Sequence, residues 1–278
     1  MRPVRDGKCL CGRFLRRQLV PYHTALILSV SSQWVNQVKT LVSTEFLCAK
    51  ASNVLKLQFA MKKQQIMSAI LDIGIVPIVR TDSAESAIKA IEAVYRGGIR
   101  SAEITMTVPG AIKALEKLAD AFGDKMVLGA GTVLDPETAR ACMLAGAQFL
   151  VTPALKLATI EMAKRYSVVI CPGALTPTEV LTAWEAGADF VKVFPCGNMG
   201  GPKYIKALKG PFPQIDMIPT GGVNLETIGE FLKAGASAVA VGGELIDAKT
   251  IKEGRYEVFE DRSRQYLAAV AKARTEMQ

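Results

Sequence analysis

The stretch Gly187-Ala188-Asp189-Phe190-Val191-Lys192-Val193-Phe194-Pro195 contains the end of a helix and a short apolar strand. A glycine between two alanines is typical of a helix C-cap, and the β-branched and aromatic residues after it favour a strand. Similar helix ends precede apolar runs at Gly97-Gly98, Ala145-Gly146-Ala147 and Ala234-Gly235-Ala236. The glycines at 98, 146, 187 and 235 are 48, 41 and 48 residues apart, about two strand-helix units each. The sequence therefore predicts a repeated alternation of strands and helices.

Eight apolar runs are candidates for the strands of this repeat. They are Ile75–Val79, Ala102–Met106, Met126–Ala130, Phe149–Val151, Val168–Cys171, Phe190–Phe194, Met217–Pro219 and Ala238–Val241. The helices between them begin at recognisable caps: Asp82 before Ser83, Asp135 before Pro136, Thr176 with Glu179 in a capping box, and Asn224 before Leu225. This pattern predicts an α/β fold, a single (β/α)8 TIM barrel over residues 61–278. An open dinucleotide-binding sheet is disfavoured, because Gly129-Ala130-Gly131 is followed by no third glycine.

The positive charge of the chain lies mainly in its first sixty residues. The 278 residues have a net charge of +8, and 50% of them are hydrophobic, a composition that excludes a disordered chain. Residues 1–60 hold nine Lys and Arg against two Asp and Glu, which leaves 25 against 24 in residues 61–278. A nearly neutral main domain has no electrostatic footprint for nucleic acid, and we expect no nucleic-acid partner.

Residues 1–60 are predicted to form an N-terminal extension without the strand-helix pattern. Their basic clusters are compatible with a targeting segment, but Met61, with Lys62, Lys63 and an amphipathic helix after it, resembles an ordinary start, which favours a misassigned start. No apolar run reaches the roughly 18–20 residues of a spanning helix, so we expect no membrane association. Six cysteines without CxxC spacing are typical of a reduced, cytoplasmic protein.

Two charged residues lie within predicted apolar strands. Lys192 is at the centre of Phe190–Phe194, where burial of an ammonium group is costly unless the group is paired or neutral. Glu103 shares one face of Ala102–Met106 with Thr105, and in a barrel this polar face points to the interior. Desolvation favours the neutral amine of a lysine, which can attack a carbonyl and form a Schiff base. The pattern predicts Lys192 as a nucleophile with Glu103 as its partner; a purely structural Lys–Glu pair is the alternative.

Glycine pairs follow the last two predicted strands. They occur in Thr220-Gly221-Gly222 and in Gly242-Gly243. In barrels, backbone N–H groups at these strand ends commonly bind phosphate, so these residues are candidate substrate contacts, although simple turns have the same composition.

Three segments in order, Gly98–Thr105, Gly129–Val133 and Gly187–Pro195 with Gly200 beyond, resemble the KDPG/KHG aldolase family. These are bacterial class I aldolases that act on 2-keto-3-deoxy-6-phosphogluconate or 4-hydroxy-2-oxoglutarate. The resemblance implies cleavage of a small 2-keto acid to pyruvate and an aldehyde, glyceraldehyde 3-phosphate or glyoxylate. It also implies a homotrimer and a reaction that needs no metal and no cofactor.

The resemblance further implies roles for individual residues. Lys192 is expected to form the pyruvyl Schiff base, and Glu103 to move protons during dehydration of the carbinolamine and cleavage of the C3–C4 bond. The residues that match the family's pyruvate pocket are Thr132, Pro153 and Phe194. Those that match positions near the far end of the substrate are Thr220, Gly221 and Gly222.

Two departures from the family pattern bear on the substrate. Thr107 stands where an arginine often closes the second strand motif, and Arg80, at the end of the first strand, is placed to supply a guanidinium for a carboxylate or phosphate. Glu244 follows Gly242-Gly243, where many relatives have serine. A carboxylate there would repel a phosphate dianion unless it points away, which raises the standing of an unphosphorylated substrate.

Two other functions remain open from the residues. One is a phosphate-binding barrel isomerase or epimerase in which Glu103 is the base and Lys192 is only electrostatic. The other is a catalytically silent metabolite-binding or RNA-associated barrel, although an unused inward Lys192 and Glu103 would only cost stability.

Overall fold

The computed structural model describes residues 62–277. They belong to one compact unit, Lys56–Gln278. The predicted extension over residues 1–60 and the predicted start at Met61 lie outside the described residues.

The described chain is built around parallel strands in two sheets. The strands are β1 (Ile75–Val79), β2 (Ser101–Thr105), β3 (Val127–Gly131), β4 (Phe149–Val151), β5 (Val169–Cys171), β6 (Gly173–Ala174), β7 (Val191–Val193), β8 (Met217–Pro219) and β9 (Val239–Val241). One sheet has the order β5-β4-β3-β2-β1-β9 and the other the order β6-β7-β8. Every strand pair is parallel, so the carboxyl ends of neighbouring strands lie at the same edge.

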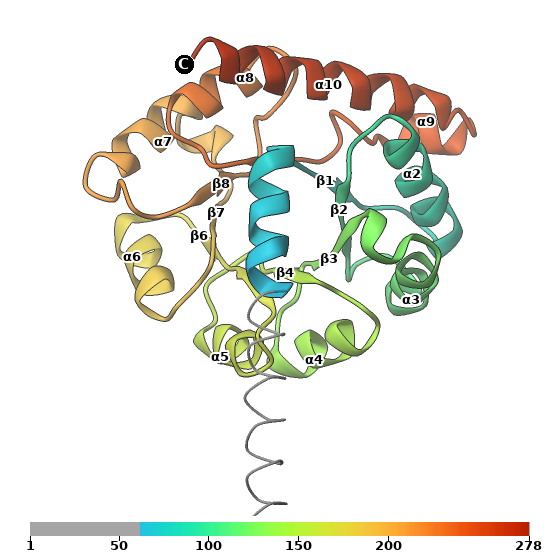
Figure 1. The fold of residues 1–278 in the computed structure, drawn as a ribbon, viewed down its shortest axis with the longest axis horizontal. Helices are drawn as coiled ribbons and strands as arrows, with labels where there is room; N and C mark the ends of the chain where they lie inside the picture. The colour runs from blue at the N-terminus through green and yellow to red at the C-terminus, as the bar shows by residue number, and fades with distance from the viewer. Residues whose placement is uncertain (1–61, 278) are drawn as a thin grey trace, which may run out of the picture. The chain divides into compact units, whose positions relative to one another are not determined.

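Helices surround the strands (Figure 1). They are α2 (Ala84–Arg96), α3 (Ala111–Phe122), α4 (Pro136–Leu144), α5 (Leu157–Arg165), α6 (Pro177–Glu185), α7 (Pro202–Lys209), α8 (Ile228–Lys233), α9 (Ala248–Lys252) and α10 (Glu257–Thr275), with short 3-10 turns at Gly123–Lys125 and Gly197–Met199. Among residues 62–277, no helix combines the length and apolar character needed to cross a membrane.

All eight predicted strands are present, and none of their ends differs from the prediction by more than one residue. The difference is β6, a two-residue strand beyond Cys171, where the predicted strand ends. Pro172 stands between β5 and β6, and because proline has no N–H to donate, it interrupts the ladder. The strand is therefore split, and its two halves belong to different sheets.

Hydrogen bonds link the edges of the two sheets. Thr220 after β8 forms a bridge with Ala240 of β9. On the other side, the N–H of Phe190 donates to the carbonyl of Ile170 at 3.3 Å, and the N–H of Lys192 donates to Pro172 at 2.9 Å. The strands thus form a curled parallel sheet with helices outside, in agreement with the α/β class predicted.

Two of the four predicted helix starts are confirmed. Asp135 accepts from the N–H of Thr138, and Thr176 forms the complete capping box with Glu179. Ser83, rather than Asp82, caps α2, because it is the Ser83 side chain that accepts from the N–H of Ser86.

Asn224 is a second correction. Its side chain accepts from the N–H groups of Glu226 and Thr227, so it closes a turn, and α8 begins only at Ile228.

The four glycine stops share one conformation. Gly98, Gly146, Gly187 and Gly235 have φ between 89° and 101°, a region that L side chains rarely adopt. At each stop the N–H of the following residue reaches back five residues to a helical carbonyl, as from Ala188 to Ala183. This is the Schellman motif, which turns the chain sharply from each helix into the next strand.

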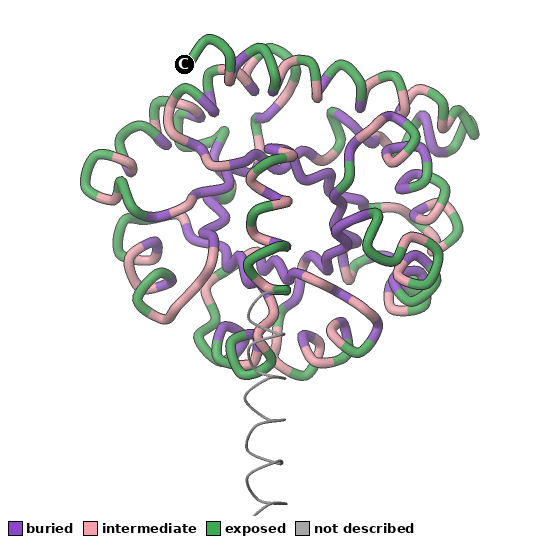
Figure 2. The backbone as a smooth tube through the Cα atoms, in the orientation of Figure 1, coloured by how far each residue is buried: buried purple, intermediate pink, exposed green. Residues whose placement is uncertain are grey.

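A further helix, over residues 62–73, lies across the amino-terminal end of the strands (Figure 1). It leads through Gly74 directly into β1, and it buries Ile66 and Ile70 against inward-facing side chains such as Val76, Phe149 and Phe190. Figure 2 shows the strands as the most completely buried part of the chain. The helix closes this end of the interior.

Candidate active site

Glu103 is buried in the middle of β2, with 1% of its surface exposed. Within the described residues its Oε1 atom has no hydrogen-bond partner. The space for the carboxylate exists because residue 131 is glycine: a Cβ there would lie 2.5 Å from Oε1 of Glu103. A buried, unpartnered carboxylate oxygen is costly in a structural role and is typical of a functional group.

The environment of Glu103 changes its acidity. Burial raises the pKa of this carboxyl group above its ordinary value, while the positive charges of Lys192 and Arg80 act in the opposite direction. A glutamic acid with a raised pKa can hold and release a proton nearer to neutral pH, as general acid-base catalysis requires.

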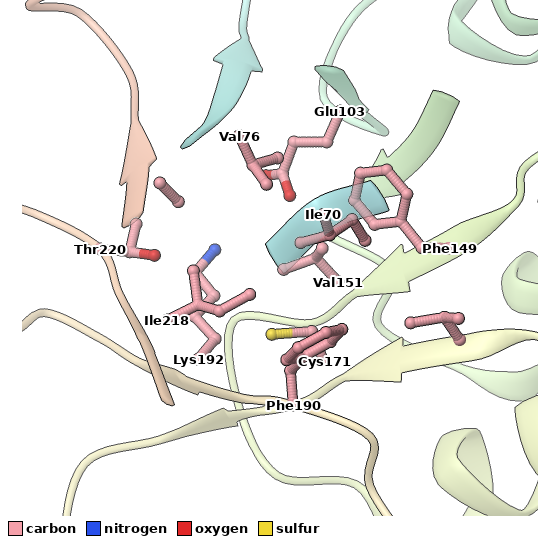
Figure 3. Close-up of a pocket in the computed structure, with 12 residues that line it drawn as sticks. Ile70, Val76, Glu103, Phe149, Val151, Cys171, Phe190, Lys192, Ile218 and Thr220 are labelled. Atoms are coloured by element: carbon pink, nitrogen blue, oxygen red, sulfur yellow. The ribbon is translucent and has the colours of Figure 1, made fainter. Parts of the chain in front are cut away.

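Lys192 projects from the centre of β7 into the same interior and is 6% exposed. Figure 3 shows its amine directed toward the space that Glu103 enters from β2, with the hydroxyl group of Thr220 nearby. The Nζ atom lies 5.1 Å from the ring centroid of Phe194, a cation–π distance. Lys192 and Glu103 therefore line one interior space, although Oε1 of Glu103 accepts no hydrogen bond from the amine, and their joint role stays a prediction.

Thr220, at the carboxyl end of β8, supplies a third polar group to this cavity. Its backbone N–H donates to Val193, and its carbonyl accepts from Cys196, so the main chain is held in place. Its Oγ1 atom is buried and has no partner among the described residues. An amine, a carboxyl oxygen and a hydroxyl thus face one cavity with unused hydrogen-bonding capacity, which suits a small polar ligand.

The rest of the cavity wall is apolar, and the sequence analysis did not identify it. It consists of Ile70, Val76, Phe149, Val151, Val169, Cys171, Phe190, Ile218 and Ala240. A signal for Ile70 was present, since Ile66 and Ile70 stand four residues apart on one face of a helix. Burial raises the pKa of the Cys171 thiol far above its ordinary value, so this thiol stays protonated and is no nucleophile.

Three predicted residues stand at strand ends around this cavity without lining it. Arg80 is exposed directly after β1, near enough for its charge to act on Glu103. Thr132 follows β3 with φ of 57°, a strained conformation for a β-branched residue. Pro153 follows β4 in close backbone contact with Gly173, the residue that pairs with Lys192.

The glycines after β8 allow two loops to pack together. Gly221 and Gly222 have φ of 90° and 78°, and a Cβ on Gly222 would lie 2.8 Å from Cα of Gly197. The N–H of Gly197 donates to the carbonyl of Gly221 at 3.0 Å. These contacts tie the loop after β7, which begins just beyond Lys192, to the loop after β8.

Gly242 and Gly243, after β9, are different. Neither has a positive φ, and a Cβ on either would meet nothing within 4 Å. The packing of the described chain therefore does not require glycine at these positions, and the space above them is open.

The two departures from the family pattern occupy exposed positions. The hydroxyl of Thr107 lies 2.8 Å from that of Thr105, whose oxygen also lies 3.2 Å from the carbonyl of Val79. Glu244 is exposed, and its charge contributes to the raised pKa of Tyr266 on α10, after burial as the larger cause. Its carboxylate thus acts on a residue of an outer helix.

Comparison with known proteins places this geometry in a family. The family model described as KDPG and KHG aldolase matches residues 66–261. The chain belongs to this family. The 2-dehydro-3-deoxy-6-phosphogalactonate aldolase of Escherichia coli K12 is 37% identical over 175 residues, which cover 63% of this chain and 85% of the relative. The 2-dehydro-3-deoxy-phosphogluconate aldolase of Treponema pallidum is 32% identical over 206 residues, 74% of this chain and 97% of the relative.

A solved structure of the family shares the fold. The KDPG aldolase of Legionella pneumophila, solved with pyruvate captured at low pH as a covalent carbinolamine intermediate, has 28% sequence identity and a TM-score of 0.67. The similarity covers 72% of this chain and 96% of that protein. The resemblance drawn from three sequence segments is thereby confirmed as family membership.

Proposed function

We propose that this aldolase-family chain is a class I aldolase that cleaves a 2-keto-3-deoxy-6-phospho sugar acid or 4-hydroxy-2-oxoglutarate. The products are pyruvate and an aldehyde, glyceraldehyde 3-phosphate or glyoxylate. The observation that carries the proposal is the joint presence of the Lys192 amine and the unpartnered Glu103 carboxyl in one enclosed cavity.

The reaction begins at the keto carbon. The Lys192 amine adds to C2, and the resulting carbinolamine loses its hydroxyl as water, with a proton supplied by Glu103, to give an iminium ion. Glu103, now a carboxylate, takes the proton of the C4 hydroxyl. The C3–C4 bond breaks, its electron pair moves into the iminium group, and the aldehyde leaves. The remaining enamine is protonated at C3, and water hydrolyses the iminium ion to pyruvate and the free lysine.

The polarity of the cavity supports these steps. A raised pKa lets Glu103 act as acid and then as base near neutral pH. The apolar wall excludes water from the enamine, which strengthens the electrostatic interactions of the iminium ion inside.

The proposed substrate contacts are residues that stand at the carboxyl ends of the strands. We assign Thr132, Pro153 and Phe194 to the pyruvyl end, with Arg80 for a carboxylate or phosphate. The far end of the substrate is assigned to Gly221, Gly222, Gly242 and Gly243, where open space above the last two glycines supports ligand approach. Thr220, whose hydroxyl faces the same cavity as the Lys192 amine, is assigned to the reacting end. The name of the relative with 37% identity supports a phosphorylated sugar acid.

Several finer features belong to the same proposal. Residues 61–278 form a single closed (β/α)8 barrel, supported by hydrogen bonds across both sheet edges. The protein is a homotrimer, supported by exposed apolar side chains such as Leu144 and Trp184 on outer helices, and light scattering of the purified chain tests this.

The protein acts in the cytoplasm, in keeping with the free thiols of Cys142, Cys171 and Cys196.

The proposal is tested by borohydride trapping. The purified chain is incubated with pyruvate and sodium borohydride, digested, and searched for a reduced pyruvyl adduct by mass spectrometry. We expect the adduct on Lys192 and none in Lys192→Met. A folded wild-type protein without an adduct would contradict the aldolase function and favour the isomerase or the silent barrel.

A further inference from the structure

The carboxylate of Asp189 connects three elements shortly before Lys192 in the chain. Its Oδ1 atom lies 2.8 Å from Nζ of Lys63, on the helix over residues 62–73. Its Oδ2 atom accepts the N–H of Ile170, in β5, at 2.9 Å. Only 19% of the Lys63 side chain and 11% of the Asp189 side chain are exposed, so solvent screens this pair less than a surface ion pair.

The backbone hydrogen bonds of the seam that Asp189 joins, between β5 and the start of β7, all run in one direction. Pro172 lies in it and offers a carbonyl but no N–H. Three N–H groups on the β7 side donate across the seam: those of Asp189 and Phe190 donate to the carbonyl of Ile170, and that of Lys192 donates to the carbonyl of Pro172. Among the described residues, the N–H of Ile170 donates to the side chain of Asp189 and to no carbonyl of β7.

The register of this seam decides where the Lys192 amine stands. Side chains alternate along a strand, so a slip of one residue would move Lys192 from the interior face to the outer face. Smaller displacements matter as well, because an error of about 1 Å in the position of a reacting group can cost about 100-fold in rate.

We infer that Asp189 is a positioning residue for the proposed aldol reaction. Together with Lys63, its carboxylate fixes the start of β7 against β5 and against the helix over residues 62–73. It thereby sets the depth at which Lys192 enters the cavity. This inference rests on the proposed Schiff-base chemistry of Lys192, and Asp189 itself touches no reacting atom.

A contact at the opposite end of the same helix provides a matched control. Arg274 of α10 donates to the carbonyls of Leu71 and Asp72, which lie in the last turn of that helix. Arg274→Gln weakens the attachment of the helix without touching the seam between β5 and β7. We therefore expect Arg274→Gln to lower the stability of the protein, as an Asp189 variant does, but to leave the position of the Lys192 amine unchanged.

The test compares the rate of iminium formation with stability in the full chain. Pyruvate is added to wild type, Asp189→Ala, Asp189→Asn, Lys63→Met, the double variant D189N/K63M and Arg274→Gln. Samples are quenched with borohydride over time, and the thermal unfolding midpoint of each protein is measured.

We expect Asp189→Ala to slow trapping about 10- to 100-fold at a temperature where it is fully folded. Asp189→Asn and Lys63→Met should slow it less, and D189N/K63M should be no slower than the slower single variant, since both remove the same pair. Arg274→Gln should lower the midpoint and trap at the wild-type rate.

Two results would overturn the positioning role: wild-type trapping by Asp189→Ala, or equal slowing by Arg274→Gln. If Asp189→Ala does not fold, Asp189→Asn and Lys63→Met decide the question. A wild type that forms no pyruvate adduct would contradict the proposed function instead. In that case, reductive methylation of Lys192 by formaldehyde and borohydride still reports whether Asp189 positions the amine.

Discussion

Gly131 lies against the carboxylate of Glu103, so that a Cβ at residue 131 would come within 2.5 Å of Oε1. Gly129, two residues earlier in the same strand, also leaves space for a side chain: a Cβ at this position would lie 2.3 Å from the Phe149 ring. The two glycines of β3 thus make room for an acid and for an aromatic wall of the same cavity.

Gly131→Ala should displace the Glu103 carboxylate, because φ at Gly131 is not positive and the steric conflict is the only obstacle. We expect kcat to fall about 10- to 100-fold and stability to fall by about 1–3 kcal/mol. The control is Gly229→Ala in α8, where a Cβ meets its nearest neighbour at an ordinary 3.8 Å. Steady-state kinetics and denaturant unfolding of both variants decide the matter; an active Gly131→Ala would show that Glu103 tolerates displacement.

Glu103→Gln removes the proton-transfer group and retains its shape. We expect kcat to fall about 100- to 10,000-fold with a smaller change in KM. In wild type, the acidic limb of kcat/KM should lie above the ordinary pKa of a glutamic acid, since burial raises the pKa of Glu103. This limb should be absent from the residual activity of the variant; its persistence would assign the limb to another group.

Stability should depend on pH through the same residue. A carboxyl group whose pKa is raised in the folded state favours folding below its unfolded pKa of about 4.5 and loses that contribution as pH rises toward the folded value. Glu103→Gln lacks this loss. Relative to wild type, the variant should therefore gain about 1–3 kcal/mol between pH 4 and pH 8, measured by urea unfolding. A constant difference across this range would contradict a raised pKa.

Glu244→Ser tests the charge beside the proposed phosphate site. If the carboxylate reaches a bound phosphate, the variant should lower KM for the phosphorylated substrate several-fold and leave KM for 4-hydroxy-2-oxoglutarate unchanged. Glu116→Ser, an exposed position on α3, is the control for net charge. Equal KM values for Glu244→Ser and wild type would mean that the carboxylate does not reach the bound phosphate.

Removal of residues 1–60 tests the predicted domain boundary. A chain of residues 61–278 retains every residue of the candidate site and the helix that closes the interior. We expect full activity and an unchanged unfolding midpoint by calorimetry. A loss of either would give the first sixty residues a role in the folded enzyme.

The fold could be predicted where local chemistry decides it. Apolar β-branched runs and glycine stops such as Gly187 determine strands and turns independently of distant contacts. The short strand β6 beyond Pro172 was not predicted, because a strand of two residues depends on which strand lies alongside. Asn224 was assigned to a helix start although its side chain closes a turn, since both uses place the same residue before the same sequence.

The residues of the candidate site could be predicted where a charged residue interrupts an apolar strand. Lys192 and Glu103 stand out for that reason. Ile70 and Asp189 do not, because their importance lies in contacts between elements far apart in the sequence. The glycines of β3 were recognised as a motif, but their use as space for Glu103 and Phe149 became evident only from the packed side chains.

The helix over residues 62–73 has a consequence for how this enzyme can change. Its Ile70 side chain forms part of the cavity wall, yet the helix contributes no strand and no proposed reacting group. Substitution of Ile70 can therefore deepen or shorten the cavity while the strands that carry Lys192 and Glu103 keep their sequence. The inner end of the cavity can in this way evolve separately from the strands that carry the proposed reacting groups.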